Sequence, residues 1–149
     1  MKASAYQYLV DSLPLIEEGK KRLGFGFYMT VYFEEGHLSA KRRAVLEVFE
    51  DYWSLCGQQL KWVTHPHTHV WQHITPQILP NKWLMQQAEE KYVWDFCYHG
   101  GDNFDDCSPF RIQGFGIPSS TYTLSFLNVS FPVTWFTEYQ AEDAPSLMS

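Results

Sequence analysis

Three histidines alternate with other residues at His65, His67 and His69, a spacing that could place them on one face of a strand. Three imidazoles on one face could hold a metal ion such as zinc. However, Pro66 and the neighbouring threonine favour a loop or an edge strand, and neither a cysteine pair nor an HExxH motif accompanies the histidines. We therefore predict no native metal site. A small metal- or ligand-binding domain that uses these three histidines remains the alternative.

A nucleophilic enzyme would need a serine or cysteine in a recognisable turn, with a histidine as its base. The chain has no GxSxG motif and no glycine loop of the phosphate-binding type. Cys97 lies two residues before His99, which puts the two on one face of a strand by geometry alone. The carboxylates of Asp102, Asp105 and Asp106 fall in a loop that we expect to be solvated, where nothing would activate them. We predict a protein without catalytic residues or cofactor, and not an enzyme.

The charge of the chain is unevenly distributed along its length. Of 11 basic and 17 acidic residues, eight of each lie between Met1 and Trp62, which leaves three basic residues and nine acids from Val63 onward. The whole net charge of −6 therefore arises in the second part (3 − 9 = −6). This balance argues against direct nucleic-acid binding. It favours either a basic protein partner or a solvated face that keeps the protein soluble.

Several of these acids, together with one tryptophan, are the predicted binding residues. Three acids follow Gly100–Gly101 within five positions, and this glycine pair should expose the loop that carries them. Tryptophan is enriched in protein interfaces. The predicted protein-binding set is Asp102, Asp105, Asp106, Glu89, Glu90 and Trp71.

The cysteine content indicates a reducing compartment. Cys56, Cys97 and Cys107 are odd in number and show no CxxC spacing, so they do not form a disulfide framework. We expect Cys56 and Cys97 to be small core residues. The sequence contains no secretory leader and no apolar run long enough to cross a membrane, so we expect a cytoplasmic protein that does not contact membranes.

Hydrophobic periodicity predicts the two clearest elements. Apolar and small or polar residues alternate over 25–33, which is typical of a strand. A helix is expected over 39–56, with Ser39 as its N-cap and Gly57 closing it. The apolar face of this helix comprises Val45, Val48, Phe49, Tyr52, Trp53, Leu55 and Cys56.

The remaining pattern predicts short strands joined by turns. The expected strands are 59–63, 70–74, 92–98, 110–117 and 121–129. A short helix capped by Asn81 should run to Glu90, and another should follow Pro132 over 133–139. We expect one α+β domain over 1–149, a mostly antiparallel sheet with the long helix and the shorter helices packed on one face, and a frayed tail at 140–149.

Five segments of the sequence resemble the type VI immunity family of Gram-negative bacteria. The resemblance extends from about Phe25 to Tyr139 and consists of patterns of aromatic and turn residues rather than catalytic signatures. The segments that carry it are Val31–His37, Arg43–Tyr52, Gly57–Trp62, Phe96–Gly101 and Thr123–Pro132.

The resemblance implies a protein that neutralises a toxin delivered by the type VI secretion system. Several such proteins are encoded beside nuclease toxins of the restriction-endonuclease fold, so the implied partner is a cognate effector toxin and the predicted binding residues would mask its basic active-site cleft. Members of the family are usually longer, which suggests that this chain is the N-terminal part of a longer protein. A subunit of a larger assembly without a toxin partner is a further alternative, and the oligomeric state stays open.

Overall fold

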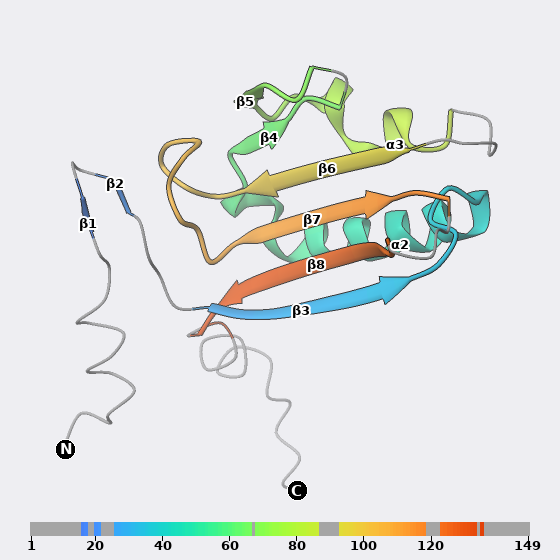
Figure 1. The fold of residues 1–149 in the computed structure, drawn as a ribbon. Helices are drawn as coiled ribbons and strands as arrows, with labels where there is room; N and C mark the ends of the chain where they lie inside the picture. The colour runs from blue at the N-terminus through green and yellow to red at the C-terminus, as the bar shows by residue number, and fades with distance from the viewer. Residues whose placement is uncertain are drawn as a thin grey trace, which may run out of the picture.

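The structure is a computed structural model that describes residues 16–17, 20–21, 26–66, 68–86, 93–118, 123–133 and 135. Figure 1 shows the order of the elements along the chain. They are β1 (Ile16–Glu17), β2 (Lys20–Lys21), β3 (Gly26–Phe33), α2 (Ser39–Cys56), η1 (Gly57–Gln59), β4 (Trp62–Thr64), β5 (Trp71–His73), η2 (Pro76–Ile78), α3 (Pro80–Trp83), β6 (Trp94–His99), β7 (Arg111–Gly116) and β8 (Ser125–Pro132).

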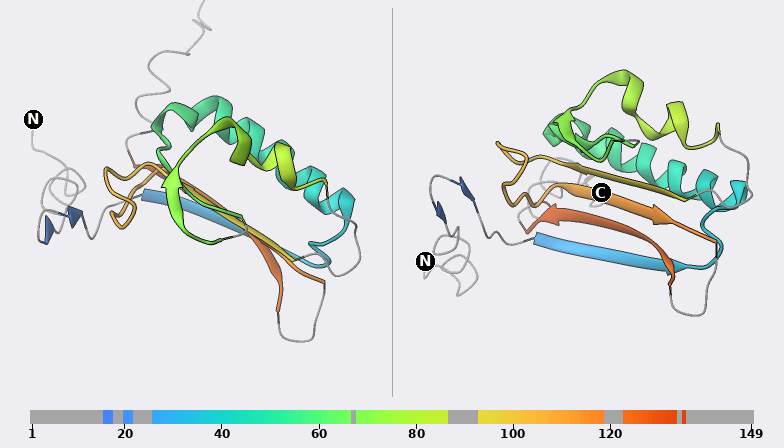
Figure 2. Two further views of the ribbon diagram at one scale, coloured as in Figure 1. Left: turned by 90° about the horizontal axis from the view of Figure 1, so that it is seen from above. Right: turned by 45° about the horizontal axis from the view of Figure 1, so that its top comes forward.

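Six of the strands form one sheet in the order β3-β8-β7-β6-β4-β5, and every neighbouring pair is antiparallel. Helix α2 runs across one face of this sheet, as the two views of Figure 2 show. The short segments η2 and α3 lie on the same side of the sheet as α2, in the part of the molecule near β6 (Figure 2). The predicted α+β class with a mostly antiparallel sheet is confirmed.

Strand β3 follows the predicted alternation and pairs with β8 along its whole length, from Gly26 opposite Pro132 to Phe33 opposite Ser125. The strand expected at 121–129 is observed as β8, which begins at Ser125 and ends at Pro132. Pro132 was expected to be the first residue of a helix. It is the last residue of a strand because the pairing with β3 continues that far.

Helix α2 has the predicted bounds, but its predicted N-cap is wrong. Ser39 is the first helical residue, and the cap position belongs to Leu38, which makes no side-chain capping bond. A turn that begins at Glu35, where φ is 55°, brings the Leu38 N–H to the Glu35 carbonyl at 3.0 Å and sets the direction of the helix. Gly57 does end the helix as predicted.

The core lies between α2 and the helix-facing side of the sheet. The Phe49 ring is its centre, with ring centroids 5.0 Å from Tyr98 and 5.8 Å from Phe96. Loss of a buried phenylalanine side chain typically costs about 3–5 kcal/mol of folding free energy. Val48 and Leu55 were placed on the apolar face of α2, but they are 39% and 47% exposed because the sheet covers a narrower strip of the helix than the periodicity indicates.

The segment between the β4–β5 hairpin and β6 differs in detail from its prediction. Helix α3 begins at Pro80, with Leu79 as N-cap, so Asn81 lies inside the helix rather than capping it. Proline is favoured as a first helical residue because the backbone N–H that it lacks would have no helical acceptor there. Residues 87–92 and 136–149 lie outside the described residues, so the expected extension to Glu90, the helix at 133–139 and the tail at 140–149 are not described.

Candidate protein-binding site

The described residues of the predicted binding set lie around strands β6, β4 and β5, and the surface they share begins on the side of the sheet that faces away from α2. Tyr98 of β6 points into the core, so its neighbour His99 lies on the opposite face. The strand register places His99 opposite Arg111 of β7 and opposite Trp62 of β4. Trp62 is in turn opposite His73 of β5, and the two rings stack with centroids 4.1 Å apart. One aromatic and basic row therefore crosses four strands of this face.

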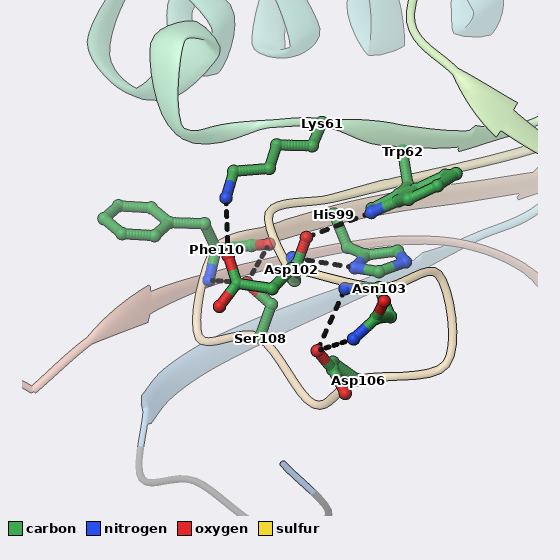
Figure 3. Close-up of polar contacts among 9 residues, drawn as sticks. Lys61, Trp62, His99, Asp102, Asn103, Asp106, Ser108 and Phe110 are labelled. Carbon is green, nitrogen blue, oxygen red and sulfur yellow. Dashed lines mark hydrogen bonds and ion pairs between the residues drawn. The ribbon is translucent and has the colours of Figure 1, made fainter. Parts of the chain in front are cut away.

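The loop of residues 100–110 joins β6 to β7 beside this row, and backbone and hydroxyl contacts fix its base. The Gly100 N–H donates to the Phe110 carbonyl at 3.1 Å. The Ser108 hydroxyl both donates to that carbonyl and accepts from the Phe110 N–H (Figure 3). Gly100 is required by packing, since a Cβ there would lie 2.1 Å from the carbonyl oxygen of Gln59.

Side chains of the neighbouring strand hold the start of the loop. The Trp62 indole N–H donates to the Gly101 carbonyl at 3.0 Å, and the Lys61 ammonium lies 2.7 Å from the Asp102 carboxylate (Figure 3). The Lys61–Asp102 pair is exposed, with 49% and 86% of the side-chain areas accessible, so it adds little stability. Its effect is electrostatic, because it places a positive charge beside one of the three acids.

Asp106 closes the tip of the loop. Its carboxylate accepts from the backbone N–H of Asn103 at 2.9 Å and from the Asn103 side-chain amide at 3.2 Å (Figure 3). The Asp106 N–H also donates to the Asn103 carbonyl at 3.1 Å. The loop is thus held in one conformation before any partner arrives, which lowers the entropy cost of binding.

His99, the last residue of β6, connects the sheet to this loop. The residue is 5% exposed, its Nδ1 accepts from the Gly101 N–H at 3.1 Å, and its Nε2 lies 3.0 Å from the Phe104 carbonyl oxygen. This pattern assigns the proton to Nε2, which then donates to Phe104. Burial lowers the pKa of His99, and the Arg111 charge acts in the same direction, whereas the Phe104 carbonyl and Asp106 oppose them. The neutral imidazole is the form that fits this site.

Trp71 and two of the predicted acids line a single depression of about 210 Å³. The Trp71 ring lies edge-on to His99, with centroids 4.8 Å apart. The lining residues are Trp71, His99, Phe104, Asp105, Asp106, Cys107, Ser108 and Arg111. Residues predicted separately from an aromatic preference and from a charge cluster therefore form one surface, which we call the Trp71 depression.

The acids of the loop differ in their exposure. Asp102 is exposed, whereas Asp105 and Asp106 are half-buried, so the expectation of a fully solvated loop holds for Asp102 alone. Glu89 and Glu90 lie outside the described residues. The sequence prediction missed His99, Phe104 and Arg111 as members of this surface. Phe104 belongs to the loop itself, whereas the register of β6 and β7 places His99 opposite Arg111 at the base of the loop.

His65 and His69 lie in the hairpin loop between β4 and β5. The His65 N–H donates to the Val70 carbonyl at 3.0 Å, the His65 Nδ1 accepts from the Thr68 N–H at 3.2 Å, and His69 adopts a positive φ of 54°. These contacts form a turn rather than a strand with a shared face. His67 is not among the described residues, and within those residues no three His, Cys, Asp or Glu side chains are grouped as metal ligands.

The expected core cysteines are buried, as predicted. Cys56 is 1% exposed, and burial raises the pKa of its thiol to about 11. Cys97 is 6% exposed, and burial raises the pKa of its thiol as well. Both thiols are therefore protonated at neutral pH and shielded from solvent, which is the environment of a structural cysteine.

No helix in the described part of the chain is both long and apolar enough to cross a membrane. No family model matches the chain, and no curated protein matches it significantly. Among solved structures, the fold is similar to that of a Pseudomonas aeruginosa protein, T6SS protein PA0821, with a TM-score of 0.68 and 21% sequence identity. The alignment covers 92% of this chain but only 42% of the other, so this chain spans less than half the length of that protein, and at this identity the similarity is one of fold.

Proposed function

We propose that this protein is an immunity protein, which binds and neutralises an effector toxin of the type VI secretion system. The observation that carries the proposal is the Trp71 depression, where a preorganised loop sets acids beside exposed aromatic surface. The sequence resemblance to type VI immunity proteins supports this role. The fold shared with a T6SS protein supports it independently.

The toxin that best fits this surface is a nuclease. A nuclease must attract a polyanion, so its active-site cleft is basic. An inhibitor that presents Asp102 and Asp105 to such a cleft gains association rate and register from their charge. The protein would then neutralise the toxin by covering the cleft, without binding nucleic acid and without chemistry of its own.

The aromatic residues of the surface supply the affinity that exposed charges do not. Trp71 is half-buried, and Phe104 is 49% exposed at the tip of the loop. Large aromatic side chains in pockets are the usual anchors of protein interfaces, whereas charges at the rim mainly change the association rate. Trp71 and Phe104 therefore form the expected centre of the interface, and the acids form its rim.

A binding titration against the toxin encoded beside the gene tests the proposal. The double variant Asp102→Asn, Asp105→Asn removes two negative charges and keeps Asp106, which holds Asn103. We expect association to slow by about tenfold at low salt, with a weaker salt dependence. The matched control is Glu47→Gln, Glu50→Gln, which removes the same charge from exposed positions on α2. Equal effects of the two variants would show that only net charge matters and that the interface lies elsewhere.

The second arm of the experiment truncates the anchor. Trp71→Ala should raise the dissociation rate by roughly 30-fold or more, which corresponds to about 2 kcal/mol for an interface anchor. A melting curve of the variant confirms that the fold is retained. A dissociation rate unchanged by Trp71→Ala would contradict the assignment of the binding centre.

A further inference from the structure

Strand β3 is an edge strand of the six-stranded sheet. It pairs with β8 on one side, and no described strand pairs with its other side. All eight residues of β3 take part in an uninterrupted ladder, so the outer row of backbone N–H and C=O groups is equally regular. The opposite edge strand, β5, has only three residues.

Strand β3 itself carries none of the residue-level features that natural proteins use to prevent edge-to-edge pairing. Charged side chains, prolines and bulges are the usual protection, and β3 contains none of them over its sequence GFYMTVYF. Its side chains are also unusually exposed for their type. Tyr28 is 77% exposed, Tyr32 65%, Met29 58% and Val31 47%.

A groove of about 260 Å³ follows the same edge on the helix side. Met29 and Val31 form its strand wall, and Ala44 and Val48 of α2 form part of the other wall. The lining is apolar except for Lys41 at one position. Apolar side chains that approach along the strand edge could therefore be buried between β3 and α2.

We propose that β3 is a homodimer interface, where the β3 strands of two copies pair antiparallel and join the two sheets into one. A second copy is the partner that fits, because the strand carries no charge for a charged partner to match and because antiparallel pairing of a strand with itself satisfies both edges equally. A twofold axis perpendicular to the sheet leaves both α2 helices on one face. The axis then passes near Met29 or Thr30, the centre of the strand.

The exposed apolar side chains of β3 supply the surface that a dimer would bury. Tyr28 and Tyr32, which are 77% and 65% exposed, are the largest contributors, since an aromatic side chain can bury roughly 150–250 Å² when it is fully covered. Each copy carries a charge of −6, which opposes association at long range. Added salt screens this repulsion, so salt should strengthen the dimer, whereas it should weaken binding to a basic toxin.

Sedimentation of the purified chain alone tests the interface, without any toxin. We expect the wild type to be a dimer at roughly tens of micromolar, as for a dissociation constant near 1 μM. Met29→Lys and Met29→Glu each place like charges directly or diagonally across the axis, so each should be monomeric. An equal mixture of the two variants should recover the dimer, because the facing charges are then opposite.

The control is Val70→Lys, which adds the same charge at a 63% exposed residue beside β5, at the other edge of the sheet. This variant should stay dimeric, and circular dichroism should show that all the variants remain folded. A monomeric wild type would overturn the proposal. A dimer that survives both Met29 substitutions, or a mixture that stays monomeric, would overturn it as well.

Discussion

His99 is the residue through which the sheet controls the shape of the binding loop. Its two ring nitrogens contact the backbone at Gly101 and Phe104, so one side chain holds both the start and the tip of the loop. The acceptor role of Nδ1 requires an unprotonated nitrogen. Protonation would turn this contact into a donor facing a donor and would release Gly101.

The stability of the protein should therefore depend on pH through His99. Its pKa is lowered in the folded protein, so the contribution of the neutral ring is complete above the ordinary value of about 6.5 and is lost as the pH falls from there toward the lowered pKa. At pH 7.5, His99→Gln should cost about 1–2 kcal/mol, because buried hydrogen bonds are lost. Melting curves should show that this difference shrinks as the pH is lowered to 5.

The charges around His99 define a control for this prediction. Arg111 disfavours the protonated ring and Asp106 favours it. Removing the positive charge with Arg111→Gln should bring the folded pKa of His99 closer to its ordinary value, so the loss of stability on acidification should be smaller and should be complete at a higher pH. A difference between wild type and His99→Gln that stays constant from pH 7.5 to pH 5 would contradict the assigned role of the ring.

At the scale of the secondary-structure elements, the β4–β5 hairpin contains histidines of the type that bind metals, but the described histidines are arranged as a turn and not on one face of a strand. In the hairpin loop, the backbone and the ring of His65 make the hydrogen bonds to Thr68, His69 and Val70 that shape the turn. The His69 Nδ1 lies 3.4 Å from a carboxylate oxygen of Asp95, on an exposed surface. The contacts of the two described histidines are thus those of a turn.

We predict that the histidine cluster is dispensable. Replacing His65, His67 and His69 together by Gln should leave the melting temperature within a few degrees, since no structural metal would be lost and the affected contacts are exposed. Metal analysis of untagged protein should find no stoichiometric zinc. Loss of folding in the triple variant, or one zinc ion per chain, would favour the metal-binding alternative.

At the scale of the whole molecule, the two proposed surfaces lie at different places on one sheet. The toxin-binding loop joins β6 to β7, whereas the dimer edge is β3, with β8 between β3 and β7 (Figure 1). Because the two interfaces respond to salt in opposite directions, each can be measured without the other.

The whole molecule is also expected to be catalytically inert. The buried thiols are protonated, with the pKa of Cys56 raised to about 11, and the ring nitrogens of His99 are engaged by the loop. Incubation with DNA, RNA and generic esters should give no turnover. Turnover that disappears in Cys97→Ser, His99→Gln or Asp102→Asn would contradict this prediction.

The sequence alone determined the local elements and the acidic, turn-bounded loop. The strand at 26–33 and the helix at 39–56 were predictable because hydrophobic periodicity is a property of neighbouring residues. Only the tertiary structure decided which residues meet. Trp71 lies 34 positions from Asp105 (105 − 71 = 34), and the two share a depression because β5, β4 and β6 pair in that order. The order of pairing also left β3 at an edge, and it depends on contacts between distant segments that no local pattern encodes.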